Sequence, residues 1–151
     1  EERLRFHAGR PTLYGLETHL AAMHGRIMQF NPSVVVVDPI SNLISTGSAI
    51  DIKMLLIRLV DIMKHRQITS VFTNLSRGPE ELEATQVGVS SIMDTWILLR
   101  DVEHADQRSR RTQIIKARGM EHSTQIVEFV LTDEGIQLTG SDEESRQAHG
   151  N

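Results

Sequence analysis

The chain has 151 residues, enough for one folded domain, and its hydrophobic share of 39% supports a core that is mostly aliphatic because only 4% is aromatic. The absence of cysteine excludes disulfides and thiolate chemistry, and a net charge of -4 argues against a dominant nucleic-acid-binding surface. No apolar run approaches the roughly 20 residues of a membrane helix and no signal peptide is visible, so the expected location is cytoplasmic.

The first 30 residues predict a short strand followed by an amphipathic helix. Residues 4–8 alternate apolar and polar side chains, as a half-buried strand does. Thr12 can cap a helix over residues 13–30, where apolar side chains recur at spacings of three and four. Asn31 and Pro32 are expected to end this helix.

The middle of the chain predicts a strand–helix–strand unit. Four consecutive valines at 34–37 indicate a strand that is buried on both faces. Ser48 and Asp51 have the spacing of a capping box, and the helix that they start is predicted to run to about His65. A second strand is expected at 68–73, and this spacing requires the two strands to be parallel.

The second half predicts an antiparallel region. The expected elements are a mobile loop at 74–88, a strand at 94–100, a charged hairpin loop at 101–110, strands at 111–117 and 125–131, and a short strand at 135–138. The fold class is therefore α/β, with a mainly parallel sheet flanked by helices and an antiparallel extension at one edge. Residues 1–139 are expected to form the domain, and 140–151 a polar, disordered tail.

Polar side chains follow the two parallel strands where each strand ends. Asp38 follows the valines, Ser41 lies in the next loop, and Asn74 follows the second strand. Open parallel sheets bind ligands at this edge, and oxygen ligands of this kind suit Mg²⁺. In the alternative interpretation, Asp38 only caps its loop and Asn74 only turns the chain.

The most basic segment lies near the end of the 111–117 strand. Alternation places Lys116 and Arg118 on one face, and Gly119 then lets the chain turn. Two such cations can clamp a terminal phosphate. The alternative is a solvated edge strand protected by its charges. A phosphate-binding loop of the form GxxxxGK[ST] is missing from the sequence.

Taken together, these segments resemble the KaiC family of RecA-like ATPases, which contains the cyanobacterial circadian clock protein. The resemblance runs from about residue 4 to residue 138 and rests on residues 10–17, 34–43, 72–74, 90–100 and 116–122. It implies a RecA-like P-loop NTPase core that binds ATP and Mg²⁺ between neighbouring subunits of a hexameric ring, with signalling proteins as further partners.

The resemblance also implies roles for single residues. Asp38 matches the Walker-B aspartate, which supports Mg²⁺ through water, with Ser41 and Asn74 close by. Residues that would contact the nucleotide of the neighbouring subunit are Arg110, Lys116, Ala117, Arg118, Met120 and His122. Ser90 and Ser91 align with the paired autophosphorylation acceptors of the clock protein, a Ser followed by a Thr, and Thr85 with a further acceptor. Here the second acceptor of the pair is serine instead of threonine.

The departures from the family concern its catalytic half. The phosphate loop, the first core strand and the pair of catalytic glutamates all precede the part represented here, and Glu1 and Glu2 are not that pair. The chain, which does not begin with methionine, is therefore expected to be the carboxyl-terminal half to two-thirds of one KaiC domain. No catalytic residue is expected in it, so hydrolysis of ATP requires the complete protein.

One consequence and two alternative functions remain open from the sequence. Without the first core strand, the valine strand presents an unpaired apolar edge, which another chain, altered pairing or poor solubility would have to accommodate. One alternative function is a non-catalytic module that docks on RecA-like ring subunits. The other is a recombination ATPase of the RadA type, against which the acidic charge and the lack of recognisable DNA-binding loops argue.

Overall fold

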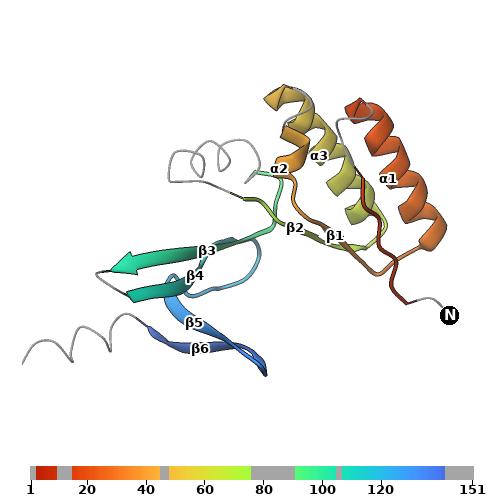
Figure 1. The fold of residues 1–151 in the computed structure, drawn as a ribbon. Helices are drawn as coiled ribbons and strands as arrows, with labels where there is room; N and C mark the ends of the chain where they lie inside the picture. Colours follow the sequence, from red (N-terminus) through yellow and green to blue (C-terminus); the bar gives the residue numbers. More distant parts are fainter. Residues whose placement is uncertain (1–2, 10–14, 45–47, 76–90, 105–106, 142–151) are drawn as a thin grey trace, which may run out of the picture. The chain divides into compact units, whose positions relative to one another are not determined.

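Parallel pairing in the first part of the chain and antiparallel pairing in the second define the fold (Figure 1). The computed structural model describes residues 3–9, 15–44, 48–75, 91–104 and 107–141. The chain divides into one unit from Glu1 to Ile92 and another from Met93 to Asn151. None of the helices in these ranges is long and apolar enough to cross a membrane.

The first helix, α1 (Leu16–Phe30), begins later than predicted. Its N-cap is Gly15, which has no side chain to cap the helix, whereas Thr12 lies outside the described residues. The predicted end is confirmed: Asn31 adopts a left-handed conformation with φ 48°, and its N–H donates to the Ile27 carbonyl at 2.9 Å. Such a residue satisfies a carbonyl that the last helical turn leaves open.

The predicted strand–helix–strand unit is confirmed. Strands β1 (Val34–Val37) and β2 (Thr69–Phe72) pair in parallel, and α3 (Ala49–His65) lies between them in sequence. The capping box is present, because Ser48 Oγ accepts from the Asp51 N–H at 3.2 Å and Asp51 Oδ2 accepts from the Ser48 N–H at 3.3 Å. The loop that was expected after β1 contains one short helix, α2 (Ser41–Ile44).

The core of the first unit is organised around α3. One face of this helix is buried, and it packs with residues of α1 and α2 and with the residues just before α2 and β2. The buried α3 residues are Ile52, Leu55, Leu56, Leu59 and Met63. Figure 1 shows α1 and α3 on the same side of the β1–β2 sheet. The helices therefore cover one face of this sheet.

Burial of the valines on both faces is the first wrong prediction. Val35 and Val37 pack against the core, whereas Val34 is 54% exposed and Val36 is 61% exposed. In a strand, successive side chains point to opposite faces. Four valines in a row therefore give one face to the helices and one face that no described element covers.

A strand at residues 4–8 is the second wrong prediction, because residues 3–9 belong to no helix or strand. A strand requires partners for its backbone N–H and C=O groups, and none of the described strands pairs with this segment. Leu4 and Phe6 are exposed, while the Arg5 guanidinium lies 4.8 Å from the centre of the Phe30 ring.

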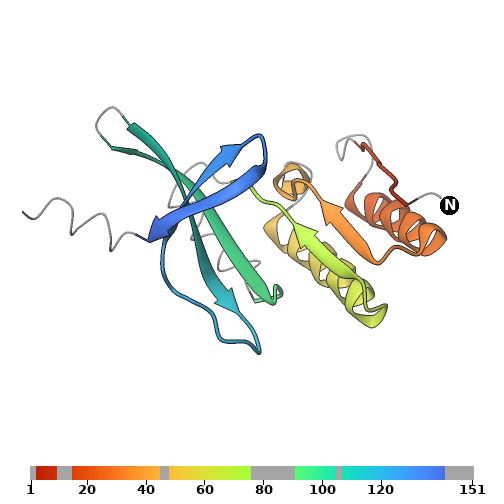
Figure 2. The ribbon, with the colours of Figure 1, turned by 90° about the horizontal axis from the view of Figure 1, so that it is seen from below.

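The second unit is an antiparallel sheet in the order β3–β4–β5–β6, visible as a twisted meander in Figure 2. Its strands are β3 (Thr95–His104), β4 (Gln107–Ala117), β5 (Val127–Thr132) and β6 (Gly135–Ser141). The charged hairpin loop that was expected at 101–110 is wrong, since both strands continue through most of it. Asp101 faces two cations across the ladder, Arg108 at 2.7 Å and Arg110 at 3.6 Å, and such opposite charges stabilise a strand pair.

Candidate functional site

The end of β1 is tied to the end of β2 by hydrogen bonds that continue beyond the strands. The Thr73 N–H donates to the Val37 carbonyl at 3.0 Å, and the Ile40 N–H donates to the Thr73 carbonyl at 2.9 Å. Between these two bonds, the Asp38 carboxylate accepts a hydrogen bond from Thr73 Oγ1. Asp38 is otherwise exposed, at the carboxyl edge of the parallel strand pair.

Asn74 follows Thr73 directly and adds a second oxygen to this edge. Its side-chain Oδ1 is buried and has no hydrogen-bond partner among the described residues. A buried carbonyl oxygen without a donor is costly and calls for a partner. The chain therefore brings the predicted Asp38 and Asn74 to neighbouring strand ends, and Ser41 begins the helix that follows the first of them.

This set of oxygens fits a hydrated Mg²⁺ better than a metal held by protein alone. The described residues contain no group of three or more His, Cys, Asp or Glu side chains that could hold a metal ion. Mg²⁺ commonly keeps several waters and takes one or two carboxylates together with substrate phosphates. The Asp38 carboxylate, at a strand end next to the strand end that Asn74 follows, is a donor of that kind.

A separate group of predicted site residues lies in the second unit, where β4 ends. Trp96 pairs with Lys116, but Ile97 pairs with Ile114, so Ile115 is an extra residue in β4 and forms a β-bulge. A bulge changes the direction in which the neighbouring side chains of the strand point. Lys116 Nζ donates to the Met93 carbonyl at 2.8 Å.

Arg118 lies just beyond the bulge. Its backbone N–H donates to the Asp94 carbonyl at 2.8 Å, and its Nη1 lies 3.9 Å from Asp94 Oδ1. Gly119 then turns the chain with φ +72°, a conformation that suits glycine. The two cations that were predicted to act together are therefore both held by the residues that precede β3.

The remaining predicted nucleotide contacts are spread more widely. Arg110 lies opposite Asp101, and the pairing across the bulge places it on the other face of β4 from Lys116. Ala117 pairs with Thr95 in the ladder, whereas Met120 is exposed and His122 half-buried after the turn. The described geometry thus groups Lys116 with Arg118 and leaves Arg110 apart from them.

Of the candidate phosphoacceptors, Thr85 and Ser90 lie outside the described residues. Ser91 is described, exposed, and lies two residues before Met93.

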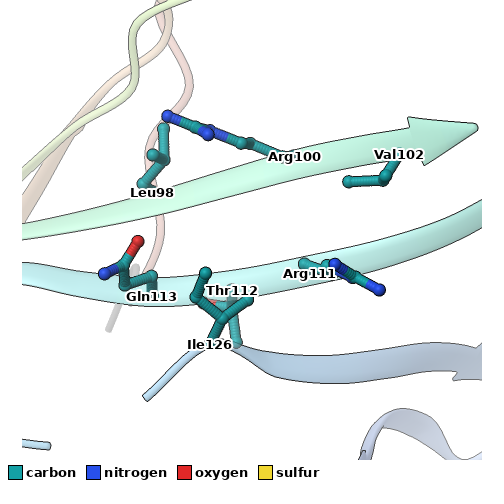
Figure 3. A pocket seen from close by; sticks show the side chains of 7 residues that line it. All are labelled: Leu98, Arg100, Val102, Arg111, Thr112, Gln113 and Ile126. Carbon is teal, nitrogen blue, oxygen red and sulfur yellow. The ribbon is translucent and has the colours of Figure 1, made fainter. Parts of the chain in front are cut away.

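Sequence reasoning missed a shallow hollow on the antiparallel sheet (Figure 3). Its lining residues are Leu98, Arg100, Val102, Arg111, Thr112, Gln113 and Ile126. Arg100 and Arg111 lie opposite each other in the ladder, and Arg111 donates from Nε and Nη2 to Glu128 Oε1, each at 3.1 Å. The alternating pattern of the sequence does not show that these residues lie opposite each other, because their pairing depends on the register between the strands.

Comparison with known proteins identifies the family of this chain. Residues 9–143 match the family described as "ATPase: KaiC". The chain is 44% identical over 137 residues to the circadian clock protein KaiC2 of Synechocystis sp., which covers 89% of this chain and 24% of that protein. It is 33% identical over 141 residues to the circadian clock oscillator protein KaiC of Thermostichus vulcanus, covering 91% of this chain and 27% of that protein.

The chain is also 33% identical over 134 residues to the circadian clock oscillator protein KaiC of Synechococcus elongatus, and the match covers 87% of this chain and 25% of that protein. The chain thus spans about a quarter of the length of these relatives. The family match covers most of the chain and includes both β1 with Asp38 and the Lys116–Gly119 element. The chain belongs to the KaiC family of RecA-like ATPases.

Proposed function

We propose that this chain is part of a KaiC-like ATPase and contributes to two nucleotide sites at once. Asp38 would serve the site of its own subunit, and Lys116 and Arg118 would reach the triphosphate of a neighbouring subunit. The observation that carries the proposal is the placement of these two cations together, after a β-bulge and before the Gly119 turn. Cations supplied in trans to a transferring phosphoryl group act as arginine fingers do.

The residues of this chain bind and orient the nucleotide in this scheme. When bound, Mg²⁺ neutralises charge that develops on the phosphate oxygens, and Asp38 would hold it through water. Lys116 and Arg118 would donate hydrogen bonds to the same phosphates, where they stabilise the negative charge of the transition state. The attacking group is water in hydrolysis, or a hydroxyl such as that of Ser90 or Ser91 in autophosphorylation, with the family's glutamates contributed by sequence outside this chain.

The wider setting follows from the same proposal. A site shared between subunits requires an oligomer, and the family resemblance implies a hexameric ring. A clock role would fit the names of the relatives. A cytoplasmic location and signalling partner proteins belong to the same proposal.

ATP hydrolysis by the longer protein that carries this chain tests the proposal. Replacement of Asp38 by Asn or of Lys116 by Ala should lower kcat/KM by at least about tenfold, because each removes a charge that acts on the phosphates. The controls are Asp133→Asn and Lys64→Ala, which make the same charge changes far from the candidate site in sequence. Equal activity of all four variants would contradict the proposal.

Phosphate mapping and nucleotide titration complete the test. Incubation of the longer protein with labelled ATP should place label on Ser90 or Ser91, and no label at either would remove the autokinase role while leaving the ATPase role. The isolated chain should bind an ATP analogue weakly in the presence of Mg²⁺, since it has no GxxxxGK[ST] loop. Tight binding by the chain alone would contradict its expected inactivity.

A second candidate function is a non-catalytic module that docks on RecA-like ring subunits. It is favoured by the apolar side chains on the uncovered face of β1 and β2, namely Val34, Val36 and Val71, which are between 46% and 61% exposed. In that case, substitution of Asp38 or Lys116 would leave ring binding unchanged, whereas Val36→Lys would abolish it.

A further inference from the structure

We propose that Asp94, together with the backbone carbonyl of Met93, positions Arg118 and Lys116 for the phosphates of the neighbouring subunit's nucleotide. Asp94 is thereby a positioning residue, which acts through Arg118 and does not itself touch the nucleotide. The inference rests on the proposed function of this chain as an ATPase with shared sites, and it adds the group that sets the geometry of the trans contact.

The backbone places Asp94 and Arg118 directly opposite each other. The bond from the Arg118 N–H to the Asp94 carbonyl, 2.8 Å long, extends the β3–β4 pairing by one step beyond Thr95 and Ala117. Side chains opposite each other on one face of an antiparallel pair are close enough to interact. The Arg118 Nη1 accordingly lies 3.9 Å from Asp94 Oδ1.

Arg118 retains the capacity to bind a phosphate in this arrangement. Its side chain is 51% exposed, and that of Asp94 is 53% exposed. A guanidinium carries five N–H donors in a planar fork, so one edge can face a carboxylate while another meets an anion. The carboxylate therefore restricts the orientation of the guanidinium without enclosing it.

The second cation is held by the adjacent residue. The bulge at Ile115 turns Lys116 toward Met93, whose carbonyl accepts from Nζ at 2.8 Å. An ammonium group has three donors, so one lysine can bind a backbone carbonyl and a phosphate oxygen at the same time. Lys116 and Arg118 are thus oriented by the two consecutive residues that precede β3, although both side chains are intrinsically flexible.

A purely structural role predicts a different result. Ion pairs with both partners half exposed contribute little to stability, so loss of this pair should leave the folded state nearly unchanged. Misplacement of a transition-state contact, in contrast, lowers the rate strongly. Activity at unchanged stability therefore separates positioning from folding.

The test is ATP hydrolysis by the longer protein with Asp94→Asn, Asp94→Glu and the control Asp133→Asn, an exposed aspartate of the β5–β6 turn. We expect Asp94→Asn to lower kcat about tenfold with a smaller change in KM, and to shift the Arg118 Nε–Hε resonance of this chain in NMR spectra. Asp94→Glu should recover at least half of the lost activity, and Asp133→Asn should match the unsubstituted protein.

The outcomes separate this inference from the proposed function. If hydrolysis is lost with Lys116→Ala but kept with Asp94→Asn, the positioning role is overturned and the ATPase proposal stands. If the unsubstituted protein does not hydrolyse ATP, both are overturned. A drop with Asp94→Asn that is accompanied by a lower melting temperature and is not recovered by Asp94→Glu would indicate a structural role and overturn the inference as well.

Discussion

The two faces of β1 offer a direct test of the fold, because adjacent valines of one strand have different surroundings. Val37 packs against the core, whereas Val36 is 61% exposed. Val36→Ala and Val37→Ala remove the same atoms from the same strand. Any loss of intrinsic strand preference is similar in the two variants, so the difference between them reports burial.

The expected magnitudes follow from the exposed fractions. Truncation of a fully buried valine to alanine loses about 1.6 kcal/mol, at about 0.8 kcal/mol per carbon. Val36 has about two-fifths of its side chain covered, which reduces its share to about 0.6 kcal/mol. Val37 should cost about 1–2 kcal/mol, since a cavity adds to the transfer term.

Urea denaturation of this chain measures both values, from the midpoints at an unchanged dependence on urea concentration. Val37→Ala should lower the free energy of unfolding by about 1 kcal/mol more than Val36→Ala does. Equal costs would refute the reasoning, because they would mean that the outer face of β1 is also covered. Measurement at several protein concentrations shows whether a second copy provides such cover.

Two further predictions concern stability and pH. Ser48→Ala should destabilise the chain by about 1 kcal/mol, because the α3 capping box loses its acceptor for the Asp51 N–H; a loss below about 0.3 kcal/mol in urea denaturation would contradict this. Burial lowers the pKa of His19, helped by the charges of His7 and Arg26, so the unfolded chain binds more protons than the folded chain as pH falls below about 6.5. The melting temperature should therefore fall between pH 7.5 and 5.5, and His19→Gln should reduce this fall; an equal fall in the variant would assign the effect to other groups.

Local sequence patterns predicted the helices of the first unit well where capping residues mark the start or the end of a helix. The start of helix α3 was predicted from its capping box, and the end of α1 from Asn31 and Pro32. The segment at 4–8 failed because alternation indicates only that a strand could form, whereas its existence depends on a pairing partner elsewhere in the chain. The valines failed in part, since a run of one residue type does not show which faces are covered.

Some features of the candidate site residues could likewise be predicted from the sequence, and others could not. Asp38 and Asn74 were expected at neighbouring strand ends, because the carboxyl ends of parallel strands meet at one edge, and the pairing of β1 with β2 places them there. The contacts of Lys116 and Arg118 with Met93 and Asp94 were not predictable, since they depend on the register of β3 with β4 and on one extra residue at Ile115. A bulge leaves no signal in a sequence that alternates on both sides of it.

Mixing of two inactive subunits tests the shared nucleotide site most directly. In the proposed ring, subunits of the longer protein with Asp38→Asn would retain the cations in trans, and subunits with Lys116→Ala would retain Asp38. A mixed ring would therefore contain interfaces with both groups intact. Each variant alone should be nearly inactive, and an equal mixture should recover about one quarter of the normal ATPase activity, the fraction of intact interfaces in randomly assembled rings. Mixed rings that stay as inactive as the separate variants would contradict a site built from two subunits.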